Sequence, residues 1–137
     1  MTDQTDLTDA EYAALAAFRH RLRRFHAFSE DAARQAGLTP SHHQLLLAIR
    51  AHADGSPSVS DVAEALVVKL HSATELVDRA VAKGLVTKEH DDPSDARRAV
   101  LALTEEGSRS LTDLSRLHRS EVRVLRDELA EVLGGLG

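Results

Sequence analysis

Apolar residues recur at steps of three and four near the start of the chain, as expected for one face of a helix. This face consists of Tyr12, Leu15, Phe18, Leu22 and Phe25. Thr8 and Glu11 have the spacing of a capping box, and Gly37 suits the position just after a helix. The pattern therefore predicts a long first helix over residues 8–36.

A second long stripe of apolar residues lies near the end of the chain, with a spacing close to a heptad repeat. Its members are Leu111, Leu114, His118, Val122, Leu125, Leu129 and Val132. Thr104 precedes the stripe and suits an N-cap. A long last helix is therefore predicted over residues 104–137.

Two shorter helices are predicted after the first long one. Thr39 and Pro40 suit the N-cap and the first position of a helix whose apolar side carries leucines and an isoleucine. Ser58 or Ser60 then caps a short helix that contains Val62, Ala63 and Leu66.

A fourth helix follows a turn over residues 67–71. The spacing of Ser72 and Glu75 predicts a capping box at its start, and Gly84 ends it. At about 100° per residue, this helix has an apolar face made by Ala73, Leu76, Val77, Ala80 and Val81. The opposite face is polar, so one side is expected to pack and the other to remain free.

Two short strands are predicted next, over residues 85–88 and 99–103, around a polar turn over 90–98. The predicted fold is therefore mainly α with a small β-hairpin wing. It is a winged helix-turn-helix with long N- and C-terminal helices, in a single domain over residues 1–137. A helix-turn-helix followed by a wing indicates double-stranded DNA as the partner.

Composition agrees with a globular helical protein, because 42% of residues are hydrophobic, 28% are charged and only 3% are aromatic. The chain has no cysteine, which excludes a disulfide framework, Cys-ligated zinc and thiol redox sensing. No apolar run approaches the ~18 residues of a membrane span. The first residues are acidic and include no apolar segment, so we expect a cytoplasmic protein without a signal peptide.

The formal net charge of −5 at first argues against a nucleic-acid partner, because phosphate contacts need Lys and Arg. Charge is unevenly distributed, however, and residues 69–98 hold six basic and six acidic residues. The predicted DNA-binding region is therefore neutral and permits binding, with specificity resting on few contacts.

The predicted DNA contacts lie at the start of the fourth helix, whose first turn reaches base edges in such folds. Glu75 can accept a hydrogen bond from cytosine, whereas basic and hydroxyl side chains suit phosphates. The candidates from this helix and the first strand are Lys69, His71, Ser72, Thr74, Glu75, Arg79 and Lys88. The alternative is a purely structural role, in which Ser72 and Glu75 only cap the helix and the other side chains form a solvated face.

The chain has eight histidines, which are possible metal ligands. His42 and His43 are adjacent, so they point about 100° apart on a helix, and no His-x-x-x-His pair occurs. No metal site and no cofactor is predicted, although a site shared between two chains stays an alternative. No catalytic motif is present either, so an enzyme is not expected.

A ligand pocket is a further hypothesis. The Arg-rich middle of the first helix either lines an anionic pocket together with His42 or His43, or forms a solvated face that leaves only Arg24 near such a pocket. We prefer the second interpretation.

The order of elements and several motifs resemble the MarR family of bacterial winged helix-turn-helix regulators. The motifs are Leu38-Thr39, Leu76-Val77-Asp78-Arg79, Lys83-Gly84-Leu85-Val86, Asp92-Pro93-Ser94-Asp95-Ala96-Arg97 and Leu103-Thr104-Glu105-Glu106-Gly107. The similarity covers most of the chain, and the combination of motifs is more specific than any one of them.

The resemblance implies roles for particular residues and regions. Residues 8–36 and 104–137 would be dimerisation helices of a homodimer, and 38–103 would be the winged-helix DNA-binding region. Arg97 of the wing, held by Asp95, would enter the minor groove, where Arg is attracted by the negative potential. Arg98 would be a second phosphate contact.

Some positions depart from the family pattern. Val67 stands where Gly is frequent, Leu70 where a polar residue is usual, and Glu75 where a base is common. Members also commonly continue into a further helix after the long last one. The resemblance therefore implies a base preference that differs from that of the better-known members.

These observations predict a sequence-specific double-stranded DNA-binding transcriptional regulator. Its expected form is a homodimeric repressor on a pseudo-palindromic operator, and the resemblance adds control by a small aromatic or anionic ligand. Two alternatives remain open, a winged-helix protein-interaction module and a small-molecule-binding protein without DNA binding.

Overall fold

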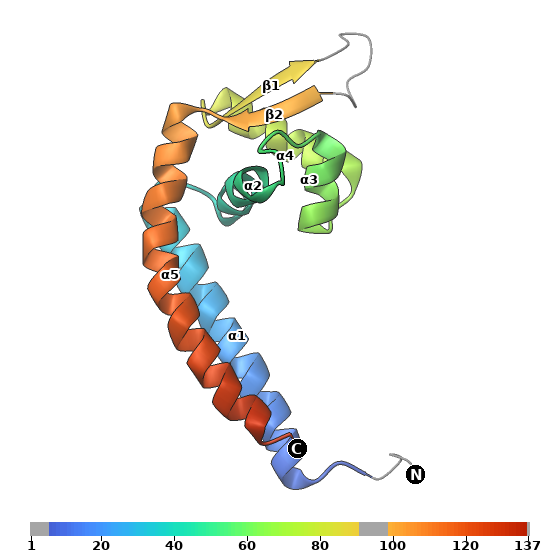
Figure 1. The fold of residues 1–137 in the computed structure, drawn as a ribbon, viewed down its shortest axis with the longest axis vertical. Coiled ribbons are helices and arrows are strands. Elements are labelled where there is room, and N and C mark those ends of the chain that lie inside the picture. The colour runs from blue at the N-terminus through green and yellow to red at the C-terminus, as the bar shows by residue number, and fades with distance from the viewer. Residues whose placement is uncertain (1–5, 91–98, 137) are drawn as a thin grey trace. The chain divides into compact units, whose positions relative to one another are not determined.

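The computed structural model describes residues 6–90 and 99–136. The described chain contains five helices and one antiparallel pair of strands (Figure 1). Their order is α1 (Asp9–Gln35), α2 (Pro40–Ala51), α3 (Val59–Leu66), α4 (Leu70–Ala82), β1 (Val86–His90), β2 (Ala99–Leu103) and α5 (Glu105–Gly134). The prediction of a mainly α fold with a small β-hairpin and long terminal helices is confirmed. The chain divides into two compact units, residues 1–32 with 116–137, and residues 33–115.

The first unit consists of α1 and the later part of α5, which run antiparallel. His118 and Ser29 are hydrogen-bonded at 2.8 Å, and Arg21 Nε lies 3.5 Å from a carboxylate oxygen of Glu128. The helices are antiparallel because the earlier residue of α1 contacts the later residue of α5. The ring of His118 also makes edge contacts with two phenylalanines of α1. Its polar tip therefore has a hydrogen-bond partner while its ring packs in an apolar stripe.

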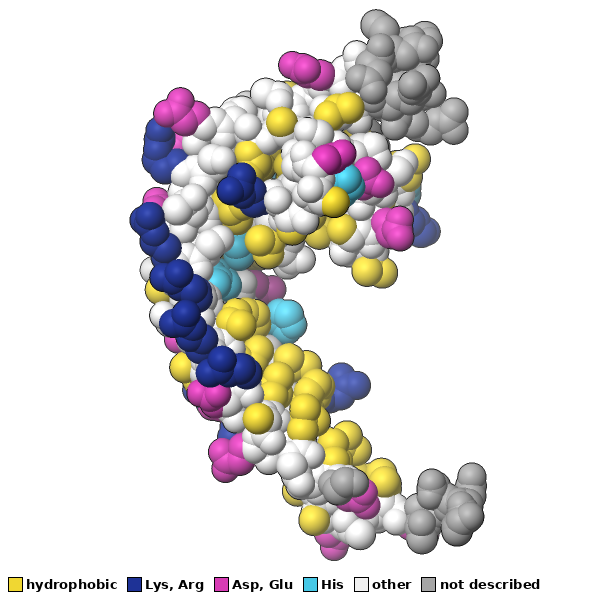
Figure 2. All heavy atoms as spheres, viewed as in Figure 1, with side chains coloured by type: hydrophobic (Ala, Val, Ile, Leu, Met, Phe, Trp, Pro, Cys, Tyr) yellow, Lys and Arg dark blue, Asp and Glu magenta, His cyan; other side chains and the backbone are white. Residues whose placement is uncertain are grey.

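Large apolar side chains of this unit remain exposed along both helices, as Figure 2 shows on the face in view. They are Leu7, Tyr12, Leu15, Leu117, Val122, Val124 and Leu133. An exposed apolar surface of this extent on a helix pair marks an interaction site.

The helix starts are set by side-chain caps, as predicted for α1, α2 and α3. Thr8 and Glu11 form a reciprocal capping box at 3.0 and 3.1 Å. Thr39 accepts a hydrogen bond from the backbone N–H of α2, and Ser58 forms a second capping box with Asp61. Of the two caps left open for α3, Ser58 is therefore the correct one.

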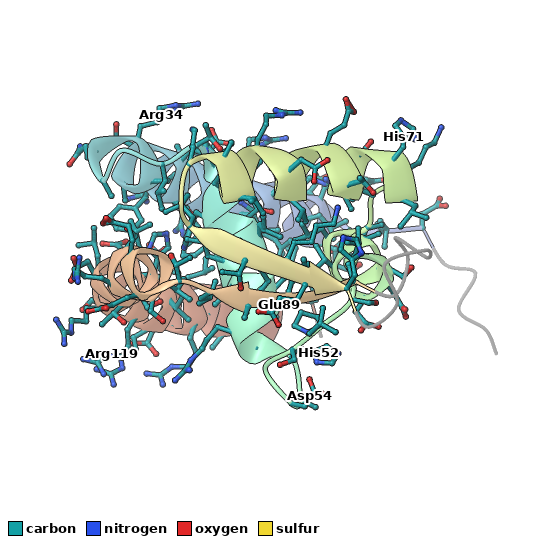
Figure 3. All side chains as sticks on the ribbon, turned by 90° about the horizontal axis from the view of Figure 1, so that it is seen from above. Arg34, His52, Asp54, His71, Glu89 and Arg119 are labelled. Atoms are coloured by element: carbon teal, nitrogen blue, oxygen red, sulfur yellow. The ribbon has the colours of Figure 1, made fainter. Side chains whose placement is uncertain are left out.

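The loop between α2 and α3 is held by His52, which the sequence analysis did not single out. Its two ring nitrogens lie 2.8 Å from an oxygen of Asp54 and 3.4 Å from an oxygen of Asp61 (Figure 3). The backbone N–H of Ser58 lowers the pKa of Asp61, with smaller contributions from the Ser58 hydroxyl and His52. The start of α3 is therefore fixed by both its cap and the preceding loop.

The second unit has its core between α2, α3, α4 and the hairpin. Leu45, Leu46, Ile49, Val62 and Leu101 are almost completely buried there. The side of α4 that faces this core has only small side chains, Ala73, Val77 and Ala80, all fully buried. Small residues allow the backbone of α4 to approach its neighbours closely, which leaves the other side of the helix at the surface.

The hairpin is joined to the turn after α4 and to the start of α5 by the two glycine motifs. Thr104 Oγ1 donates to the carbonyl of Gly84 at 2.7 Å and accepts from the N–H of Gly107 at 3.0 Å. Gly84 has φ +76°, which favours glycine. A Cβ at Gly107 would collide with the backbone carbonyl of Leu85. Residues of the Lys-Gly-Leu-Val motif therefore contact residues of the Leu-Thr-x-x-Gly motif directly.

The predicted start of the fourth helix is wrong. The helix begins at Leu70, with Lys69 as N-cap, and no side chain caps it. Ser72 and Glu75 therefore do not form a capping box. The left-handed residue Val67 follows the end of α3, and the N-cap of α4 is Lys69, three residues before Ser72. The described helices include none that is both long enough and apolar enough to cross a bilayer.

Candidate nucleic-acid interface

The outward side of α4 is polar and accessible. At about 100° per residue, His71, Glu75 and Asp78 lie opposite the buried side of the helix, and all three are exposed. Figure 3 shows His71 projecting from one end of α4. The prediction of an amphipathic helix with one packed and one free side is therefore confirmed.

The first turn of α4 carries most of the predicted contact residues. Lys69, His71, Ser72 and Glu75 are all exposed, and Lys69 has extended backbone as the N-cap. Since no side chain caps this turn, its backbone N–H groups and its side chains are both free to meet a ligand. Backbone N–H groups at a helix N-terminus are suited to phosphate.

Two predicted residues further along α4 differ in accessibility. Thr74 is half-buried and its hydroxyl donates to the carbonyl of Leu70 at 3.0 Å, so this group is already used within the helix. Arg79 is exposed and lies beside a cavity described below. Arg79 is therefore available for an anion, whereas Thr74 supports the helix.

Lys88 on β1 is bound within the protein. Its Nζ lies 3.2 Å from Oδ1 of Asp78, and its side chain is only 16% exposed. The pair ties the wing to α4. Spacing along the sequence does not predict this contact, because it joins residues ten positions apart on different elements.

The wing has the predicted pairing. Strands β1 and β2 are antiparallel, with Val86 opposite Leu103 and His90 opposite Ala99. The carbonyl of Pro57 accepts a hydrogen bond from the N–H of Leu101 at 2.8 Å, which anchors the hairpin beside α3. Asp95, Arg97 and Arg98 lie outside the described residues, so their predicted roles stay predictions.

His42 is in the first turn of α2 and is only 2% exposed. Neither ring nitrogen has a hydrogen-bond partner in the described part of the chain. Burial lowers the pKa of His42, and the nearby charges of Lys83 and Arg79 lower it further. The imidazole is therefore neutral at pH 7 and holds one free donor and one free acceptor.

A cavity of about 470 Å³ adjoins His42, between the start of α2 and one side of α4. Its lining residues are Thr39, Ser41, His42, Val68, Ser72, Leu76, Arg79 and Lys83. Two cations, the N-terminus of a helix and an unpaired imidazole suit a small ligand that carries a negative charge.

The other two residues of the predicted ligand pocket lie elsewhere. His43 is buried in the core of the same unit. Arg24 belongs to the other unit, where it lines a cavity of about 200 Å³ beside Phe25 and Phe28, with its guanidinium 3.9 Å from Glu128. Each unit thus has its own cavity, and in the cavity of the first unit the arginines are balanced by Glu121 and Glu128. Among the described residues, no three acidic, His or Cys side chains are grouped as metal ligands.

Comparison with known proteins gives a consistent result. Residues 36–98 match the model of the MarR family. The HTH-type transcriptional repressor MdtR of Bacillus subtilis (strain 168) is 37% identical over 71 residues, which cover 52% of this chain and 44% of that protein. The match thus spans less than half of that relative's length.

Solved structures show the same fold at lower identity. AbsC, a MarR family transcriptional regulator from Streptomyces coelicolor, superposes with a TM-score of 0.75 at 24% identity over 92% of this chain and 84% of its own. A variant of MarR from E. coli, complexed with operator DNA, gives a TM-score of 0.69 at 21% identity over 96% and 94%.

Proposed function

We propose that this chain, whose residues 36–98 match the model of the MarR family, belongs to that family and is a homodimeric transcriptional regulator that binds double-stranded DNA. One observation carries the proposal. The outward side of α4 and its uncapped first turn are exposed, while the opposite side is buried and a β-hairpin follows directly. This is the arrangement in which a recognition helix enters a major groove.

The proposed contacts follow from side-chain chemistry. His71, Ser72 and Glu75 would read base edges, because they project from the first turn and the outward side of α4. Lys69, Arg79 and the free N–H groups of the turn would contact phosphates. Arg97 and Arg98 of the wing would contact the adjacent minor groove and backbone, with Asp95 orienting Arg97. Lys88 would act mainly by holding the wing against α4.

Homodimer formation is supported by the exposed apolar side chains of α1 and α5. These helices bury little of their own apolar surface, and residues such as Tyr12 (59% exposed) and Val124 (50% exposed) face outward. A second copy would cover them and place two copies of α4 about one helical turn of DNA apart, on a pseudo-palindromic operator.

Ligand control and repression are the finer part of the proposal, for a regulator acting in the cytoplasm. The cavity next to His42 offers an anionic or aromatic ligand two cations and a free imidazole, and Ser72 and Arg79 belong to both the cavity and the DNA-binding face. A ligand bound there would compete with DNA for these side chains, which gives the differential affinity that ligand control requires.

A mobility-shift assay with DNA from upstream of the protein's own gene tests the proposal. Wild-type protein should bind in low-salt buffer, and Arg97→Ala should bind about tenfold more weakly, since one specific contact contributes about 1–3 kcal/mol. Arg50→Ala, which removes an exposed arginine of α2, is the matched control and should bind like wild type.

Two other outcomes would contradict the proposal. No binding at low salt would support a protein-interaction module that only dimerises. A small ligand that binds the protein without changing its DNA affinity would support a small-molecule-binding protein instead.

A further inference from the structure

Three exposed apolar side chains lie at the turn between α3 and α4. Val67 is 89% exposed, the largest value among the large hydrophobic side chains of the described chain. Val68 and Leu70 are 43% and 42% exposed. We refer to Val67, Val68 and Leu70 as the apolar tip.

The backbone of the apolar tip is strained at Val67. Val67 has φ 57° and ψ 50°, and it is the only non-glycine residue of the described chain with positive φ. The N–H of Val67 donates to the carbonyl of Glu64, and that of Val68 to the carbonyl of Ala63, so Val67 occupies the left-handed position of a Schellman motif. Glycine fits this position without strain, whereas a β-branched side chain does not. A strained residue of this kind points to a function of its side chain.

The apolar tip adjoins the first turn of α4, which carries most of the proposed DNA contacts. Leu70 is the first residue of α4, between Lys69 and His71, and the same turn carries the exposed Ser72. Lys69 places a positive charge within the tip itself, which favours a polyanion over an apolar protein surface as the partner. An apolar side chain cannot pair with the donors and acceptors of a base edge. It does match one other feature of the major groove, the C5-methyl group of thymine.

We propose that the apolar tip contacts thymine methyl groups in the major groove and so specifies thymine beside the bases read by His71 and Glu75. This inference rests on the proposed DNA-binding function. It adds that the half-site holds thymine at fixed positions and that Leu70 and Val67 determine this preference.

The test begins with a duplex selected by the wild-type protein from a library with a randomised core. Each thymine of the selected duplex is then replaced singly by uracil, which removes the methyl group and keeps the base pair. At one or two positions of each half-site, uracil should weaken binding by about fourfold, the effect of one buried methyl group. At the other thymines it should have no effect.

Two variants and one control assign the effect to the apolar tip. Leu70→Ala and Val67→Gly should bind the thymine duplex more weakly and should no longer distinguish thymine from uracil. Val67→Gly relieves the left-handed strain, so loss of folding cannot explain its result. Val81→Ala is the matched control, because Val81 lies on the same side of α4 three turns later and is 38% exposed. It should retain the full uracil effect.

The outcomes separate this inference from the proposed function. Sequence-preferring binding that is indifferent to uracil at every position overturns the inference and leaves DNA binding intact. Failure to select any duplex overturns the proposed function and the inference with it. A change of oligomeric state in Leu70→Ala, without a change in uracil sensitivity, would show that the tip is a protein contact.

Discussion

His42 provides the sharpest test of the electrostatic reasoning, through the substitution His42→Leu. The imidazole is 2% exposed, and neither ring nitrogen has a hydrogen-bond partner among the described residues. A buried polar group without a partner costs about 1–3 kcal/mol of stability. Leucine fills a similar space without a polar atom, so we expect the free energy of unfolding to rise by about 1–2 kcal/mol at pH 7.

The pH dependence of the same variant follows from linkage. The pKa of His42 is lowered in the folded protein from an unfolded value of 6.5. Below pH 6.5 the unfolded chain therefore binds a proton at His42 that the folded chain does not. Wild-type stability falls in this window as the pH drops towards the folded pKa. His42→Leu has no group at this position that binds a proton. The difference in the free energy of unfolding between the variant and wild type should therefore grow as the pH falls.

Denaturant unfolding at pH 7.5, 6.5 and 5.5, at one protein concentration, gives the free energy of unfolding of variant and wild type. Their difference near neutral pH measures the gain in stability, and its change with pH measures the linkage. His71→Leu is the matched control, because it makes the same chemical change at an exposed position and should alter stability by less than about 0.5 kcal/mol. A destabilised His42→Leu, or a difference that does not change with pH, would refute the reasoning. Either result would mean that the imidazole is paired in the folded protein.

Three further substitutions test the packing, each by thermal or denaturant unfolding. Gly107→Ala should destabilise the protein by about 1–3 kcal/mol, because its Cβ would overlap the carbonyl of Leu85. Gly134→Ala in the same helix meets no atom within 4 Å and should be neutral or stabilising, so equal effects of the two substitutions would contradict the close contact. Ser58→Ala should cost about 1 kcal/mol by removing the cap of α3, and an unchanged stability would show that the cap is dispensable. Leu101→Ala should cost about 2–5 kcal/mol, since the side chain is completely buried, and a loss below 1 kcal/mol would mean that the core collapses around it.

Local patterns in the sequence were sufficient to predict most of the fold. Each capping residue, such as Thr8, Thr39 or Ser58, accepts a hydrogen bond from the residue three positions later in the chain. These hydrogen bonds can therefore be predicted from spacing. The amphipathic character of α4 and the hairpin after Gly84 could also be predicted, because each depends on short-range periodicity and turn chemistry.

The errors and omissions concern contacts or conformations that spacing does not encode. The start of α4 was misplaced because Ser72 and Glu75 have the spacing of a capping box, while the left-handed residue Val67 moves the helix start to Leu70. Likewise, spacing does not predict the ion pair between Lys88 and Asp78, because it joins two different elements. In the proposed ligand site, His42 lies beside a cavity with Arg79, whereas Arg24 lines a different cavity in the other unit.

The ion pair between Lys88 and Asp78 has a consequence for how strongly ionic strength would control the proposed binding. Each phosphate neutralised by a free cation releases condensed counter-ions and steepens the dependence of affinity on salt. Lys88 is already neutralised by its own chain, and Glu75 and Asp78 place negative charge on the same helix as Arg79. Binding would therefore release fewer counter-ions than the number of basic side chains on this face suggests, because Lys88 would contribute none. The salt dependence of affinity would report the contacts of Lys69, Arg79 and the wing arginines alone.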